Sequence, residues 1–225
     1  MRKLRIARRT IACAMLYVSM PMVAHSASIE GEVLPLPPRQ KAVVVNPYPG
    51  RAHTSTAHAE EARPTGAWKD VVVFLRGDDL PTRATKGKAH ELAQRGKAFV
   101  PHVLPIEVGD RVEFPNFDPF YHNVFSYSPV KRFDLGKYAE GQSSSIMFPD
   151  PGEVRIFCDI HSEMNAVILV MGNRFFTQPD ESGHFQISDV PPGRYELVLW
   201  HPDRPEQART VDVPVSGLDG LTLGF

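Results

Sequence analysis

Short runs of alternating apolar and polar residues are the main pattern along the chain. In residues 153–158, Val154, Ile156 and Cys158 fall on one face of an expected strand, because successive side chains point to opposite sides. Residues 70–75 form a continuous apolar run, which predicts a strand buried on both faces. Further strands are predicted at residues 30–34, 42–45, 90–94, 98–105, 111–114, 144–148, 164–171, 183–187, 194–200, 209–215 and 221–225. Many short strands separated by turn-forming residues predict an all-β sandwich or barrel.

The composition agrees with an all-β protein and argues against some classes of function. The 225 residues include 21 Pro and 16 Gly, which disfavour helices, and 42% are apolar, which is enough for a sizeable core. Lys and Arg number 25 against 26 Asp and Glu. This balance argues against a nucleic-acid binder, which needs a basic excess. No apolar run reaches the roughly 18 residues of a transmembrane helix, so no integral membrane segment is expected.

The N-terminal residues have the pattern of a secretory signal. Residues 1–9 carry five basic side chains and no acid, residues 10–24 are uncharged and mostly apolar, and small residues follow. We therefore predict a signal peptide over residues 1–27, cleaved between Ser26 and Ser28, and a periplasmic protein. Its removal takes away five basic groups, leaving 20 basic and 26 acidic groups, a net charge of −6, and a single cysteine, Cys158.

The candidate chemistry lies around this cysteine. Cys158, His161 and Met164 are spaced as Cys-x2-His-x2-Met, and His122 lies 36 residues before Cys158. One thiolate, two imidazoles and one thioether suit copper better than magnesium or calcium, and a trigonal His2Cys set with a weak axial Met is a blue-copper site. Asn123 is placed to stiffen the connection at His122 and to donate its backbone N–H towards the sulfur.

The same residues can also be interpreted without a copper site. In one alternative, Cys158 is a buried small residue, the histidines are ordinary surface residues and the methionine belongs to the core. The other alternative is a structural zinc site, although zinc takes four Cys or His ligands and methionine is a poor one. His201 is expected to make a local hydrogen bond at a strand end, and His102 and His184 are expected to be solvated. Motifs for a serine nucleophile, a phosphate loop or a multicopper oxidase are not found, so the protein is not expected to be an enzyme.

Residues 94–170 resemble the plastocyanin and amicyanin group of cupredoxins. The resemblance is carried by residues 99–101, 108–114, 122–124, 148–152 and the 158–164 loop, which has the short amicyanin-like spacing. It implies an eight-stranded Greek-key sandwich, one type 1 copper held by His122, Cys158, His161 and Met164, and electron exit through the exposed edge of His161. Residues 132–145 are expected to be an insert that covers the site or shifts its partner surface.

The C-terminal residues 172–225 resemble a carboxypeptidase-regulatory or transthyretin-like β-sandwich, on the pattern of residues 183–197. About 54 residues are few for such a fold, and residues 30–34 and 70–75 look like its missing strands. We therefore expect a signal peptide (1–27), N-terminal strands with a polar loop (28–87), a cupredoxin domain (88–171) and the second, smaller sandwich (172–225). The copper domain is then inserted into a discontinuous second sandwich.

The expected function is that of an exported blue copper protein, which carries single electrons between unidentified redox partner proteins by Cu(I)/Cu(II) cycling. Two alternatives stay open. One is a periplasmic copper-trafficking or storage protein that uses the same ligands without rapid redox turnover. The other is a cell-envelope interaction module in which the copper site is secondary.

Overall fold

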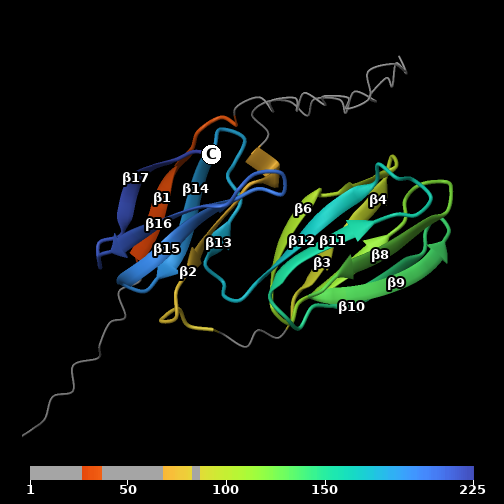
Figure 1. The fold of residues 1–225 in the computed structure, drawn as a ribbon, viewed down its shortest axis with the longest axis horizontal. Helices are drawn as coiled ribbons and strands as arrows, with labels where there is room; N and C mark the ends of the chain where they lie inside the picture. Colours follow the sequence, from red (N-terminus) through yellow and green to blue (C-terminus); the bar gives the residue numbers. More distant parts are fainter. Residues whose placement is uncertain (1–26, 37–67, 83–86) are drawn as a thin grey trace, which may run out of the picture.

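The computed structural model describes residues 27–36, 68–82 and 87–225, which form two β-sandwiches (Figure 1). No helix in these ranges is long and apolar enough to cross a membrane. The terminal sandwich comprises β1 (Ala27–Val33), the 3-10 helix η1 (Trp68–Asp70), β2 (Val72–Arg76), β13 (Phe176–Thr177), β14 (His184–Val190), β15 (Gly193–Trp200), β16 (Gln207–Val213) and β17 (Leu218–Leu223). The central sandwich comprises β3 (Ala89–Glu91), β4 (Ala93–Arg95), β5 (Ala98–Val100), β6 (Val103–Glu107), β7 (Arg111–Pro115), β8 (His122–Ser128), β9 (Lys131–Tyr138), β10 (Ser143–Met147), β11 (Gly152–Phe157) and β12 (Asn165–Met171).

The central sandwich packs a three-stranded sheet, ordered β10-β7-β3, against a five-stranded sheet, ordered β6-β12-β11-β8-β9. Alternate residues of β7 and β11 point into one core, where Phe114, Val154 and Ile156 are fully buried. Cys158 follows β11 on the same face and belongs to the same core, as the period-2 pattern predicts.

The terminal sandwich is built from strands of both ends of the chain. β1 lies between β14 and β17, and β2 lies between β13 and β15, which continues to β16. Figure 1 shows β1 (red) and β2 (orange-yellow) among the blue C-terminal strands. The described chain therefore leaves this sandwich after β2 and re-enters it at β13, with the whole central sandwich in between.

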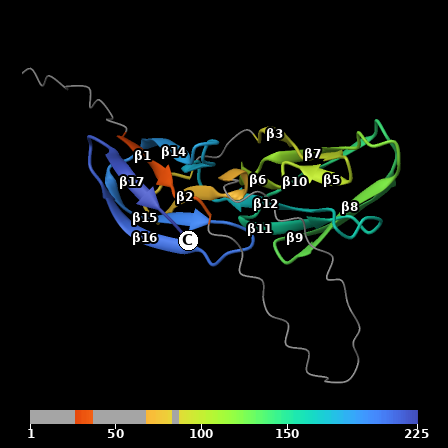
Figure 2. The same ribbon diagram turned by 90° about the horizontal axis from the view of Figure 1, so that it is seen from above.

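A third apolar cluster lies between the two sandwiches. β2 and β15 contribute Val72, Phe74, Val198 and Trp200, and the central sandwich contributes Val103, Val167, Leu169 and Met171. Figures 1 and 2 show β6 and β12 on the side of the central sandwich that faces β2. The prediction that residues 70–75 are buried on both faces is confirmed, because alternate side chains enter the terminal core and this interface.

Two sequence expectations about the central sandwich are wrong. Residues 132–145 are not an insert over the site, because β9 pairs with β8 and β10 pairs with β7. Phe133 and Leu135 alternate with polar residues and pack against the core, which is the pattern of a strand with one buried face. The described central sandwich also has ten short strands rather than the eight that the resemblance implied. The predicted strands at 90–94 and 98–105 are each divided into two, and β8 and β9 were not predicted as strands. The predicted strand at 42–45 and the signal peptide lie outside the described residues.

Buried polar groups also brace the central core. The Tyr138 hydroxyl accepts a hydrogen bond from the Gln94 amide at 2.6 Å and donates one to the Phe114 carbonyl at 2.7 Å. Burial, opposed by the Gln94 hydrogen bond and assisted by the nearby Cys158 charge, raises the pKa of Tyr138 to about 12. The folded protein therefore favours the neutral phenol.

We expect the stability that this phenol contributes to be lost at high pH. It is fully present below the unfolded pKa of about 10 and disappears as pH rises towards 12, a loss of about 2 to 3 kcal/mol. Tyr138→Phe removes the titrating group, so denaturant unfolding between pH 9 and 12 should show a shallower decline than in the wild type. Tyr195 is present in both proteins, so its contribution to the pH dependence is the same in each and does not affect the comparison. Parallel declines would contradict the assignment.

Candidate metal centre

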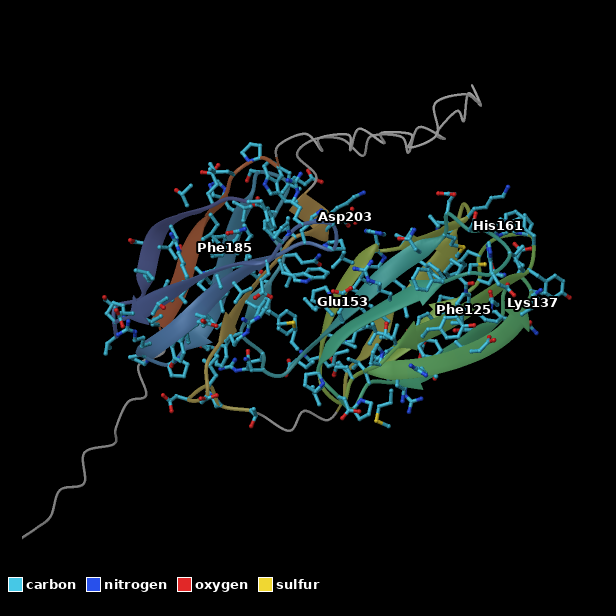
Figure 3. The ribbon with its side chains drawn as sticks, in the orientation of Figure 1. Phe125, Lys137, Glu153, His161, Phe185 and Asp203 are labelled. Carbon is cyan, nitrogen blue, oxygen red and sulfur yellow. The ribbon has the colours of Figure 1, made fainter. Side chains whose placement is uncertain are left out.

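The candidate ligands come from the start of β8 and from the loop between β11 and β12. These two strands pair from Gly152 opposite Val170 to Phe157 opposite Asn165, so the 158–164 loop closes a β-hairpin. The Cys158 N–H donates to the Met164 carbonyl at 3.2 Å, and the Met164 N–H donates to the His161 carbonyl at 2.9 Å. Figure 3 shows His161 on the side of the central sandwich away from the terminal sandwich.

Three donor atoms converge on one point. The Nδ1 atoms of His122 and His161 lie 3.1 Å apart, and they lie 3.8 and 4.0 Å from the Cys158 Sγ. Ligand atoms bound at about 2.0–2.3 Å to one metal ion are themselves roughly 3 to 4 Å apart, so this spacing fits a single ion. His122 and Cys158 are buried and His161 is half-buried. In the described ranges no other group of His, Cys, Asp or Glu has such geometry.

Met164 and Asn123, the other two predicted site residues, lie beside this cluster. Met164 is buried at the end of the loop and packs in the same apolar core as Cys158. The Asn123 side-chain oxygen accepts a hydrogen bond from the Asp159 N–H at 2.7 Å. Asn123 therefore ties β8 to the residue that follows Cys158. Axial ligation by Met164 and an N–H contact from Asn123 to the sulfur stay predictions.

Asp118 orients His122, although it was not among the predicted site residues. Its Oδ2 lies 2.8 Å from His122 Nε2, and its carboxylate also accepts the backbone N–H groups of Gly96 at 2.6 Å and Lys97 at 2.9 Å. Burial alone would raise the pKa of Asp118, but the hydrogen bonds from Lys97, His122 and Gly96 outweigh it and lower this pKa. The ionised carboxylate keeps the proton on Nε2, so the Nδ1 lone pair faces Cys158 and His161.

A tight hairpin turn provides the two backbone donors to Asp118. Gly96 and Lys97 connect β4 to β5 and have φ values of 63° and 60°. Positive φ at both central residues defines a type I′ turn, which suits the twist of a two-residue hairpin. The Asp118 N–H in turn donates to the Asn116 side chain at 2.9 Å. An Asn-x-Asp pattern before His122 was the available sequence signal, but nothing local showed where the carboxylate points.

Aromatic rings cover the two histidines. The Phe120 ring centroid lies 5.2 Å from that of His122 and 5.6 Å from that of His161. Burial lowers the pKa of His161, and the nearby positive groups of His122 and Lys97 lower it further. The neutral imidazole that results is the form that binds a metal. Of the neighbouring aromatic residues, Phe117 and Tyr121 are exposed.

Three other histidines, His102, His184 and His201, carried a prediction from the sequence. His201 accepts a local hydrogen bond from the Asp203 N–H at 3.1 Å, as expected at a strand end. His184 is the exposed first residue of β14, which is consistent with the predicted solvation. His102 is not solvated, because its side chain is only 15% exposed, lies 3.2 Å from the Asp70 carboxylate, and is enclosed between the sandwiches. The turn-like residues around His102 gave no sign of this packing.

No family model matches the chain, and no curated protein matches it. Solved structures that resemble part of it are cupredoxins, at low identity. A copper-containing nitrite reductase from Thermus scotoductus is 32% identical over 36% of this chain, with a TM-score of 0.35, and the match spans 22% of the reductase. A purple cupredoxin from Nitrosopumilus maritimus is 19% identical over 37% of this chain and 99% of its own, with a TM-score of 0.34. A reduced amicyanin variant is 18% identical over 44% of this chain and 98% of its own, with a TM-score of 0.36.

Proposed function

We propose that the protein binds one copper ion through His122, Cys158, His161 and Met164 and carries single electrons between redox partner proteins. The observation that carries this proposal is the convergence of two imidazole nitrogens and one cysteine sulfur within 4.8 Å of one another in a largely buried pocket. A thiolate and two imidazoles form the donor set of blue-copper sites. Copper bound there would supply a one-electron Cu(I)/Cu(II) couple.

The surrounding residues suit rapid electron transfer because they hold the donors in place. Asp118 orients His122, and the β11–β12 ladder closes the ends of the loop that bears Cys158 and His161. Donors that hardly move between oxidation states keep the barrier to electron transfer small. His161 is the least buried donor, so we propose that electrons pass through its exposed edge, next to Ile160, which precedes it in the chain and is also exposed.

The wider organisation of the protein belongs to the same proposal. We propose export to the periplasm from the signal pattern of residues 1–27, and a cupredoxin domain at residues 88–171 inserted into the second sandwich. The pairing of β1 with β14 and β17, and of β2 with β15, supports the insertion. The transthyretin-like relationship of the terminal sandwich and a non-enzymatic role remain proposals too.

The test is a titration of the metal-free protein with cupric salt. We expect intense visible absorption that saturates at one copper per chain, together with a reversible one-electron reduction. Fast electron self-exchange distinguishes a carrier from a copper-storage or trafficking protein. A protein that binds no copper, or that stays colourless and electrochemically silent when loaded, would contradict the proposal.

A further inference from the structure

His102 joins the two sandwiches close to the metal-ligand loop. It lies in the connection between β5 and β6, on the face of the central sandwich that meets the terminal sandwich. Its Nδ1 is 3.2 Å from Asp70 Oδ2, and Asp70 is the last residue of η1 in the terminal sandwich. The Asp70 side chain is 4% exposed, so this contact between the sandwiches is shielded from solvent.

The other nitrogen of the same ring contacts the end of the ligand loop. His102 Nε2 lies 3.2 Å from Asn165 Oδ1, and the Asn165 amide nitrogen donates to the Glu163 carbonyl at 3.0 Å. That second bond sets the orientation of the amide, so Oδ1 is the atom that faces His102, and it accepts a hydrogen bond when Nε2 carries a proton. Asn165 immediately follows Met164, and together with Glu163 it brackets this predicted ligand.

Backbone and apolar contacts restrict the movement of His102. The Val167 N–H donates to the His102 carbonyl at 2.8 Å, which holds the backbone of His102 against β12. The apolar cluster that contains Val103, Val167 and Leu169 packs the same strands against β2 and β15. The ring of His102 is therefore held from both sandwiches, and each of its nitrogens faces an acceptor.

We propose that His102 is a positioning residue through which the terminal sandwich holds the Met164 end of the metal-ligand loop. Asp70 orients the imidazole, the imidazole holds Asn165, and Asn165 holds the backbone on both sides of Met164. The expected effect on the metal rests on the proposed copper site. The chain of contacts from Asp70 through His102 to the loop does not depend on it. The terminal sandwich is thus part of the support of the metal centre.

The test compares full-length wild-type protein with His102→Leu, which removes both contacts, and Asp70→Asn, which leaves the imidazole in place. In metal-free protein we expect the backbone amides of residues 163–166 to exchange with deuterium roughly 3 to 10 times faster in His102→Leu, and by a smaller factor in Asp70→Asn. In copper-loaded protein we expect both variants to change the ratio of the visible bands and the EPR rhombicity, because these report the axial ligand.

A matched pair in the same sandwich provides the control. His90 Nε2 lies 2.7 Å from Asp110 Oδ2, at the end of β7 opposite to Asn116. His90→Leu and Asp110→Asn remove a comparable pair and should leave exchange at residues 163–166 and the copper spectrum unchanged. Wild-type-like exchange and spectra in both His102→Leu and Asp70→Asn, or equal changes in the controls, would overturn the proposal. If the wild type binds no copper, the proposed function fails, while exchange in the metal-free protein still decides whether His102 holds the loop.

Discussion

Cys158→Ser is expected to abolish the visible colour of the copper-loaded protein. The absorption of a blue-copper site comes from charge transfer between a thiolate and Cu(II), and a serine hydroxyl cannot replace that thiolate. The Sγ of Cys158 lies 3.8 and 4.0 Å from the two imidazole Nδ1 atoms, so the substitution removes one corner of the cluster. The measurement is the visible spectrum at saturating copper, with copper content determined on the same sample.

A second sulfur residue of the central sandwich serves as the control for Cys158→Ser. Met147 on β10 is 50% exposed and lies outside the ligand loop, so Met147→Ser should keep both the colour and the copper content. Circular dichroism of the metal-free Cys158→Ser protein checks that the fold persists. Full colour in a folded Cys158→Ser protein would show that Cys158 is not a copper ligand.

Asp118→Asn is expected to weaken copper binding by about 10- to 100-fold, the usual effect of removing the carboxylate behind a metal-bound histidine. The ionised Asp118 keeps the proton of His122 on Nε2 and makes the imidazole a stronger donor, since the two groups lie 2.8 Å apart. Stronger donation stabilises Cu(II) over Cu(I). The neutral amide should therefore also raise the reduction potential. Competitive copper titration and voltammetry measure the two effects.

Asp110 provides a closely matched control for Asp118. It is also buried, accepts the backbone N–H groups of Lys88 at 2.7 Å and Glu107 at 3.0 Å, and contacts His90 Nε2 at 2.7 Å. Asp110→Asn should therefore cost similar stability without changing copper affinity or potential. Equal copper affinities in the two variants would mean that Asp118 is a structural residue with no influence on the metal.

Two strands show what the pattern of apolar and polar residues can predict and what it cannot. Residues 70–75 were predicted to be buried on both faces, and Val72 and Val73 indeed enter different cores. The strand at 131–138 was missed, because residues 132–145 were interpreted as an insert relative to the plastocyanin and amicyanin group. Alternation within a strand is a local pattern that the sequence shows directly. Whether two isolated apolar residues such as Phe133 and Leu135 belong to a core strand depends on the sheet with which they pair.

The sequence by itself determined the chemistry available to this protein. Strand alternation, the turn residues and the Cys-x2-His-x2-Met spacing are local, so the all-β class and the three candidate ligands of the 158–164 loop could be inferred without a structure. His122 lies 36 residues before Cys158, and it was included because a second imidazole completes the donor set of a blue-copper site.

Only the tertiary structure decided how that chemistry is supported. Asp118 reaches His122 because the β4–β5 turn holds its carboxylate. His102 meets Asp70 because the two sandwiches pack together, and it meets Asn165 because β6 pairs with β12. His102 and Asn165 are 63 residues apart in the chain. Such contacts depend on the register of sheets and on how their faces pack, and these are set by the sum of many distant interactions rather than by the residues near each partner.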